Sequence, residues 1–131
     1  MLCLTVTFNA FCQSEDSLVV VFWNLENFFD HVDQGTGESD KEFSSYGSRH
    51  WNRKKFQIKC DAVAKSIMWM GDRYGRVPDL IGLAEIENKG VLTKLLRTTV
   101  LRKHAYGIVH HDSGDRRGID VHILYRTSAM R

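Results

Sequence analysis

The sequence predicts a layered α/β fold, and the order of its apolar segments is the main reason. Two short apolar runs, at residues 18–23 and 80–84, are each followed by a segment with helical periodicity. Two strand-like segments then follow, at 106–109 and 119–125, and a turn-rich loop separates them. Strands alternating with helices are typical of α/β folds, and the last two strands indicate an antiparallel hairpin.

The first strand is predicted over residues 18–23, where branched and aromatic side chains form an unbroken apolar run. Such a run is typical of a strand buried on both faces, and it ends at Asn24. Residues 31–50 are polar and contain Gly35 and Gly37, which predicts a long irregular loop. Long loops in compact domains are usually functional or mobile.

An amphipathic helix is predicted after Asn52, a residue suited to cap a helix N-terminus. Its apolar side chains recur at alternating spacings of four and three, which places on one stripe Phe56, Cys60, Val63, Ile67 and Met70. Gly71 is predicted to end the helix. The stripe requires a sheet or another helix to cover it.

The second strand, at 80–84, follows Pro78, and proline is tolerated at the beginning of a strand. Glu85 and Glu87 come at its end, and Asn88 is suited to cap a second helix at 91–101. The side chains expected to face inward from that helix are Val91, Leu92, Leu95, Leu96 and Val100.

The last strand is predicted from an alternation of apolar side chains, namely Ile119, Val121, Ile123 and Tyr125. Asp120 then lies on the polar side of that alternation. A polar residue at this position faces solvent or points into a site.

The bulk composition indicates a soluble globular protein with one modest domain. The chain has 131 residues, with 43% hydrophobic and 26% charged residues, which are ordinary values. The formal net charge of +2 is too small to indicate a nucleic-acid binder by itself.

Basic residues nevertheless gather at two places, and such clusters favour anionic partners. Arg116 and Arg117 are adjacent in a loop. The other cluster is interpreted as a solvated helix face, and its members are Arg49, Arg53, Lys54, Lys55 and Lys59.

The first fourteen residues carry no charged side chain and are mostly apolar. They are too short to span a bilayer as a helix, and we interpret 1–14 as a truncated signal-peptide remnant ahead of a domain at 15–131. A first strand is the alternative, because residues 4–8 alternate between apolar and polar. The interpretation predicts a secreted or periplasmic protein with Cys60 as its one thiol, and the alternative predicts a cytoplasmic one.

Glu85 is the best candidate for a metal ligand, because a carboxylate at a strand end is suited to Mg²⁺ or Mn²⁺. Asn24, at the end of the first strand, is the second candidate for the metal site, and it is also suited to bond a phosphate oxygen or the carboxylate that holds the metal. The simpler alternatives are a solvent-facing glutamate and a turn-forming asparagine.

Other kinds of site are disfavoured by the sequence. A zinc site at His110, His111 and His122 has the wrong spacing, because adjacent side chains on a strand point to opposite faces. The sequence has no glycine-rich phosphate loop, nucleophile elbow or CxxC motif, which argues against P-loop, serine-hydrolase and thioredoxin-like functions.

Three motifs in order resemble the endonuclease/exonuclease/phosphatase superfamily, which includes deoxyribonuclease I. The sequences of these motifs are similar to those of secreted bacterial members. The motifs are WNLENFFD at 23–30, PDLIGLAEIEN at 78–88 and DSGDRRGIDV at 112–121. The resemblance implies a four-layer α/β/β/α sandwich and hydrolysis of phosphate esters with a divalent metal. Asn24 matches the active-site asparagine of the first strand, and Glu85 matches the metal-binding glutamate. Asp120 lies near an acidic residue that orients the catalytic histidine in some members.

The family normally continues with an Asp-x-Asn motif and a terminal Asp-His pair, which activate water. Asp30 followed by His31 lies in the first loop and does not match that pair. We therefore interpret the chain as roughly the N-terminal half of such a domain, inactive by itself. The alternative is a non-catalytic fragment or a binding remnant. Nucleic acid is the favoured substrate, with sugar phosphates, inositol phosphates and lipids left open.

Without the second sheet, the apolar faces near 19–22 and 80–83 would be exposed and would favour association.

Overall fold

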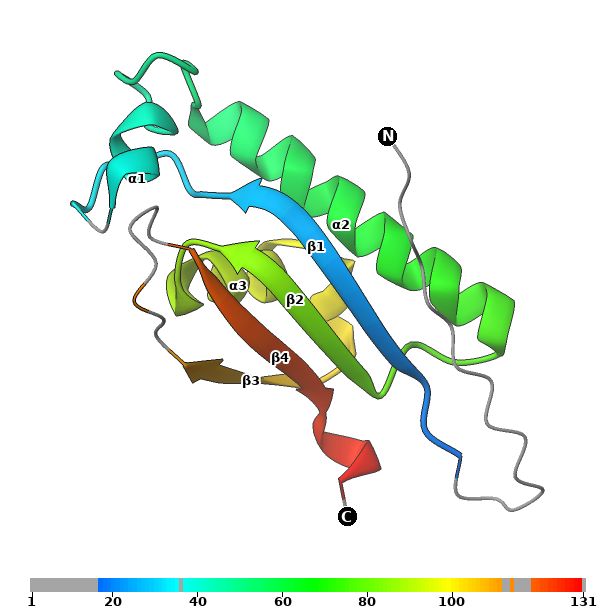
Figure 1. Ribbon diagram of the computed structural model, residues 1–131. Helices are drawn as coiled ribbons and strands as arrows, with labels where there is room; N and C mark the ends of the chain where they lie inside the picture. The colour runs from blue at the N-terminus through cyan, green and yellow to red at the C-terminus, as the bar shows by residue number, and fades with distance from the viewer. Residues whose placement is uncertain (1–16, 36, 112–113, 115–118, 131) are drawn as a thin grey trace.

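The computed structural model describes residues 17–130, apart from 36, 112–113 and 115–118 (Figure 1). The elements follow one another in the order β1 (Val20–Phe28), α1 (Glu38–Glu42), α2 (Arg53–Tyr74), β2 (Leu80–Ile86), α3 (Lys89–Thr98), η1 (Val100–Lys103), β3 (Tyr106–His111), β4 (Asp120–Arg126) and η2 (Thr127–Ala129). The predicted α/β class is confirmed. Residues 1–14, interpreted above as a signal remnant, and Arg116 and Arg117 lie outside the described residues.

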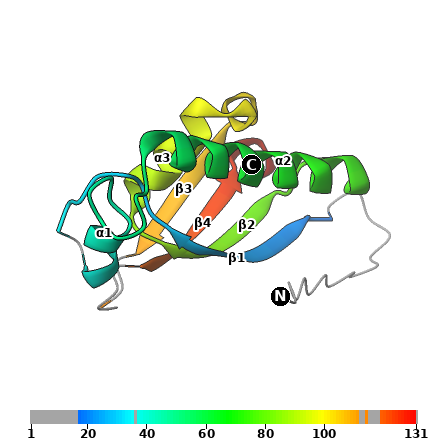
Figure 2. The same cartoon turned by 90° about the horizontal axis from the view of Figure 1, so that it is seen from above.

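The described strands form one mixed sheet in the order β1-β2-β4-β3. β1 and β2 run parallel, whereas β4 is antiparallel to both β2 and β3, so the predicted hairpin is confirmed. Figure 2 shows α2 and α3 on the same side of this sheet. One helix layer on one sheet layer corresponds to one α/β half of an α/β/β/α sandwich.

The core lies between that sheet and the two helices. β2 contributes Ile81 and Leu83, and β4 contributes Leu124, all fully buried. The helices supply most of the remaining buried side chains, which include Phe56, Cys60, Val63, Ile67, Val91, Leu92 and Leu95. Burial raises the pKa of the Cys60 thiol to about 12, so this residue behaves as an inert core side chain.

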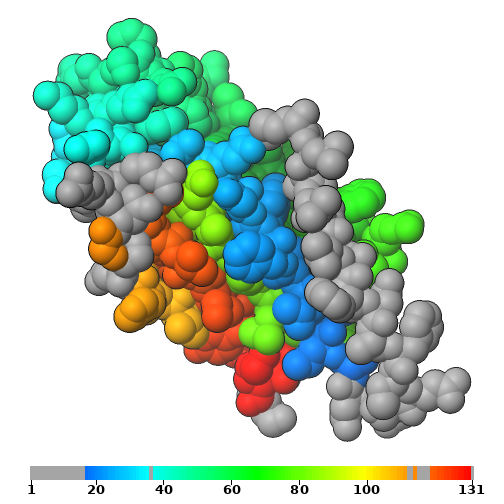
Figure 3. Space-filling view, viewed as in Figure 1, coloured from blue at the N-terminus to red at the C-terminus, as the bar shows by residue number. Residues whose placement is uncertain are grey.

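The opposite face of the sheet, which faces the viewer in Figure 3, is not covered by α2 or α3, and it carries the exposed apolar residues Val20, Phe22, Val121 and Ile123. Val20 and Phe22 of β1 are 58% and 63% exposed, so the expectation that this strand is buried on both faces was wrong. Phe22 lies over Gly82 of β2, where a Cβ atom would come within 2.7 Å of the ring. The helices cover one face only, and alternate residues of β1 therefore remain accessible.

The faces of β4 are the reverse of those predicted. Asp120, His122 and Leu124 are buried on the helix side, whereas Val121 and Ile123 are exposed on the open face. Both faces of this strand carry apolar residues, so alternation alone does not identify the covered one. The position of α2 and α3 decides it.

The helix N-termini lie where the sequence predicted them, but the C-termini do not. Asn52 caps α2 and Asn88 caps α3 through their side chains, as predicted. Gly71 does not end α2, which continues to Tyr74 and is followed by Gly75 at φ 77°. Gly71 instead packs closely against Val77, where a Cβ atom would lie 3.0 Å from Cγ1.

Two further segments differ from prediction. Within the predicted loop at 31–50, residues Glu38–Glu42 form the short helix α1. α3 ends at Thr98, and the change to the 3-10 helix η1 leaves Val100 exposed while Leu101 is buried. No helix among the described residues is long and apolar enough to cross a membrane.

Candidate active site

The ends of β1 and β2 form an irregular corner that holds two of the three predicted site residues, Asn24 and Glu85. Asn24 pairs with Ala84, and the ladder then breaks until Phe28 pairs with Ile86. β1 and β2 end at the same edge of the sheet, where β4 begins (Figure 1). The parallel pairing therefore brings residues far apart in sequence to one corner.

Three non-glycine residues at this corner have left-handed backbone conformations. The φ angles are 51° at Glu26, 53° at Asn27 and 61° at Glu85. Each costs about 1–2 kcal/mol for an L-residue, so the surrounding contacts must hold the corner in place. Strain of this kind is concentrated at functional sites in proteins.

The Glu85 carboxylate receives one hydrogen bond on each oxygen. The Asn24 side-chain amide donates to Oε1 at 3.1 Å, and the Asn27 backbone N–H donates to Oε2 at 3.1 Å. The Oδ1 atom of Asn24 accepts from the Glu26 N–H at 2.8 Å, which fixes the orientation of the amide. The structure therefore brings Asn24 and Glu85 into direct contact, with a further lone pair on each carboxylate oxygen.

Lys59 reaches the same corner from α2, although the sequence indicated a solvated helix face. Its Nζ atom donates to the Glu26 carbonyl oxygen at 2.6 Å and to the Asn27 carbonyl oxygen at 3.3 Å. The side chain is half-buried. Burial lowers the pKa of the Lys59 ammonium, while the nearby charges of Glu26 and Glu85 raise it. Arg53, by contrast, is exposed.

A second group of charged side chains is buried directly behind this corner. Glu87 accepts from the Asp30 N–H at 2.8 Å, and the side-chain amide of Gln34 bridges the Asp30 and Glu87 carboxylates at 3.2 Å to each. Lys94 forms an ion pair with Asp30, and Asp40 accepts from the Gln34 N–H. Asp30, Asp40 and Glu87 are each only 2% exposed. This network joins the segment after β1 to α1 and α3.

Burial raises the pKa of the Glu87 carboxyl to about 7, and the charges of Asp30 and Asp40 raise it further. The Asp30 N–H and Lys94 oppose this increase. A carboxyl whose pKa is higher in the folded state than in the unfolded one stabilises the fold only while it is protonated.

We expect the free energy of unfolding to fall by about 3 kcal/mol as the pH rises from about 4.5 to about 7, because Glu87 then ionises in a buried site. Urea unfolding across this pH range measures the effect. Glu87→Gln, which does not titrate, should flatten the profile, whereas the exposed control Glu38→Gln should keep it. Parallel profiles for the wild type and Glu87→Gln would contradict this assignment.

Asp120, the third predicted site residue, lies on the helix side of the sheet at the start of β4. It pairs with Ile86, one residue beyond Glu85. Asn24 lies on the exposed side of β1, so the structure places Asp120 near the corner but on the opposite face from Asn24. Its proposed catalytic role stays a prediction.

The three histidines of β3 and β4 divide between the two faces of the sheet, since His110 and His122 lie on the helix side and His111 on the other. The rings of His110 and His122 stack at 4.5 Å between centroids, with Nδ1 of His110 2.6 Å from Nε2 of His122. His111 lies elsewhere, in an apolar hollow with Val109 and Ile123. Within the part of the chain that is described, no three His, Cys, Asp or Glu side chains are placed to hold one metal ion.

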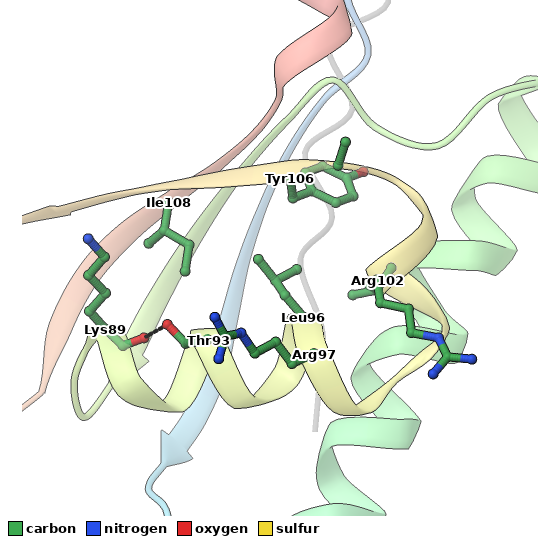
Figure 4. A pocket seen from close by; sticks show the side chains of 9 residues that line it. Lys89, Thr93, Leu96, Arg97, Arg102, Tyr106 and Ile108 are labelled. Carbon is green, nitrogen blue, oxygen red and sulfur yellow. Dashed lines mark hydrogen bonds between the residues drawn. The ribbon is translucent and has the colours of Figure 1, made fainter.

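A larger open groove of about 420 Å³ lies between α3 and the edge strand β3 (Figure 4). Its lining includes the basic side chains Lys89, Arg97 and Arg102, with Tyr106 at one end. It does not include Asn24 or Glu85, so the strained corner is a surface site separate from this groove.

The corner fits one part of a magnesium site. Mg²⁺ in proteins is commonly bound by one or two carboxylates, and water and substrate phosphate complete its coordination. Glu85 supplies an oriented carboxylate, and Asn24 supplies an amide next to it. A cation held in this way does not require a cage of three protein ligands.

Residues 19–131 match the Endonuclease/Exonuclease/phosphatase family, and this range includes Asn24, Glu85 and the whole sheet. No curated protein and no solved structure matches the chain.

Proposed function

We propose, because the chain belongs to the endonuclease/exonuclease/phosphatase family, that Glu85 is the metal-binding carboxylate of a Mg²⁺- or Mn²⁺-dependent phosphoesterase site. Membership of this family indicates a phosphodiesterase- or nuclease-like hydrolase. The observation that carries the assignment to Glu85 is its position between the Asn24 amide and the Asn27 N–H, at the adjoining ends of two parallel strands.

The residues of this chain orient the carboxylate. Two N–H donors, one on each oxygen, restrict the rotation of the Glu85 side chain. Asn24 is in turn held by the Glu26 N–H, so it is positioned to bond either Glu85 or a phosphate oxygen. A divalent cation bound here would polarise the phosphoryl group and offset the charge that develops on it.

We propose that the water-activating groups are not among these residues. Asp30 is followed by His31 in sequence, but Asp30 is buried and paired with Lys94, so it does not match the catalytic Asp-His pair of the family. The chain should therefore bind the cation without turning over a substrate. A non-catalytic binding remnant is the alternative function.

We propose that the substrate is nucleic acid. We also propose that the protein is secreted or periplasmic. Membership of a family of endonucleases, exonucleases and phosphatases supports the first proposal, as do the adjacent basic residues Arg116 and Arg117 in the sequence. The apolar segment 1–14 supports the second.

Titration of the ¹⁵N-labelled chain with Mn²⁺ tests the metal site. The amide signals of Asn27 and Glu85 should broaden first, because a paramagnetic ion at this carboxylate lies closest to them. Signals of α3 residues around Arg97 should persist at the same Mn²⁺ concentration. Uniform broadening over the whole chain would contradict a site at this corner.

Activity is measured in parallel, on supercoiled plasmid DNA and on a phosphomonoester, with Mg²⁺ or with EDTA. We expect neither substrate to be cleaved by the chain alone. Mg²⁺-dependent cleavage that EDTA stops would show that the chain contains a complete site, and the preferred substrate would then identify its class.

A further inference from the structure

We propose that Lys59 is a positioning residue for Glu85, whose ammonium group holds the end of β1 in the conformation that directs the Asn27 N–H at the carboxylate. The proposal rests on the proposed function of Glu85 as a metal ligand. It assigns to Lys59 an effect on cation affinity without a contact to the cation.

The first step is the position of the ammonium group. Two consecutive carbonyl oxygens, those of Glu26 and Asn27, converge on the one Nζ atom of Lys59. The same two residues have the left-handed backbone conformations that break the ladder between β1 and β2. A cation shared by both carbonyls therefore stabilises the conformation that the chain would otherwise avoid.

The second step connects this conformation to Glu85. The peptide between Glu26 and Asn27 carries both the carbonyl that accepts from Lys59 and the N–H that donates to Glu85 Oε2. Because a peptide group is planar, fixing its carbonyl on one side also fixes the direction of its N–H on the other. Lys59 and Glu85 thus bind opposite ends of one peptide group.

The third step is the rigidity of Lys59 itself. Its ammonium lies 5.3 Å from the ring centroid of Phe28 and 5.9 Å from that of Trp51. The indole N–H of Trp51 donates to the Phe29 carbonyl oxygen at 2.9 Å, which ties this ring to the chain just after β1. The aromatic contacts restrict the side chain, so its hydrogen bonds are formed at a low cost in conformational entropy.

The hydrogen bonds of Lys59 in the described structure go to carbonyl oxygens, so the Glu85 carboxylate keeps its outer lone pairs for a cation. Residues that orient a metal ligand in this manner typically change metal affinity by 10- to 100-fold when they are replaced. A purely structural lysine would affect folding and leave the affinity of the folded protein unchanged.

The test compares Lys59→Met with Lys59→Arg by ¹⁵N NMR. Lys59→Met keeps the packing on the two rings and removes the charge, so the Asn27 amide proton should move upfield before any metal is added. About tenfold more Mn²⁺ should then be needed to broaden the Glu85 signal. Lys59→Arg, which keeps the charge and the donors, should need less than about threefold more.

Lys55→Met is the matched control, because Lys55 is also on α2 and donates to a carbonyl oxygen, that of Arg49, at 3.3 Å. It should leave both measurements unchanged. If Lys59→Met does not fold, Lys59→Gln replaces it, since glutamine is neutral and too short to reach both carbonyls. A folded neutral variant with the wild-type Asn27 shift and Mn²⁺ affinity would overturn the proposal.

The variant Glu85→Gln distinguishes a wrong assignment of Lys59 from a wrong assignment of the metal site itself. Wild-type Mn²⁺ binding in Glu85→Gln would overturn the metal site itself. Lost binding in Glu85→Gln with wild-type binding in the neutral Lys59 variant would overturn the role of Lys59 alone.

Discussion

Glu85→Gln is expected to weaken Mn²⁺ binding by about 100-fold or more, because it removes the negative charge at the proposed site. It also places an amide where the carboxylate now accepts from both Asn24 and Asn27. One of those two donors would face an N–H₂ group, so the side chain would lose its fixed orientation as well as its charge. Mn²⁺ titration followed by amide line broadening measures the loss.

The fold should survive this substitution, since Glu85 is only half-buried and lies near the end of β2. We expect a change of about 1 kcal/mol in the free energy of unfolding, the usual value for one hydrogen bond. Glu26→Gln is the matched control, because Glu26 is an exposed carboxylate on the same bulge. Equal Mn²⁺ affinities in Glu85→Gln and the wild type would remove Glu85 from the site.

The parts of this fold that depend on local chemistry could be predicted from the sequence. Asn52 and Asn88 cap their helices because their side chains bond N–H groups three residues later, and this requires no tertiary contact. The order of strands and helices follows similarly from periodicity. The end of α2 could not be predicted from the local sequence, because Gly71 and Gly75 are both suited to end a helix. Of the two, only Gly75 has a left-handed backbone conformation in the structure.

The covered face of the sheet could not be predicted, since it depends on where the helices pack. Val121 and Ile123 have the alternation of core residues, yet they are exposed, and His122 is buried in their place. The alternation of apolar and polar residues predicts that a strand has two different faces. It does not predict which of the two faces α2 and α3 cover, and in this fold they cover the face that carries Leu124.

Three site residues were predicted, and the structure adds the contacts that hold two of them, Asn24 and Glu85. The first strand was expected to end at Asn24, but β1 continues to Phe28, and Glu26 and Asn27 have left-handed conformations where its pairing with β2 is broken. Lys59 was missed because it stands among basic residues that are exposed. Its place beside Cys60, on the margin of the apolar stripe, is the signal that could have identified it.

The buried group behind the site was also missed. The sequence placed Glu87 at the end of the second strand, next to the helix cap Asn88, and gave no sign that its carboxyl is buried. The burial of Glu87 with Asp30 requires the segment after β1 to fold back onto β2, which is a long-range contact that sequence periodicity does not contain.

Asp79→Ala is expected to lower the free energy of unfolding by about 2–4 kcal/mol, because it removes a buried carboxylate that accepts from two partly exposed arginines and a backbone N–H. Asp79 lies just before β2 and is 1% exposed. It pairs with Arg126 at 2.5 Å and with Arg76 at 3.3 Å, and it accepts from the Val19 N–H at 2.9 Å. One carboxylate therefore joins the start of β1 to the end of β4.

Urea unfolding measures this effect, and thermal unfolding should show a midpoint about 10–15 °C lower. The exposed Asp72 gives the control Asp72→Ala, which should change stability by less than about 0.5 kcal/mol. A loss below about 1 kcal/mol in Asp79→Ala would mean that the two arginines reach solvent when their partner is removed.

Asp79 and Glu85 lie at opposite ends of β2, so their variants should fail in different ways. Asp79→Ala should unfold more easily but bind Mn²⁺ with wild-type affinity while it is folded. Glu85→Gln should keep its stability and lose the cation. If both variants lost stability and cation affinity together, the strained corner would depend on the whole sheet for its shape. Separate losses would show that the contacts of the corner itself, including those of Lys59, are sufficient to hold it.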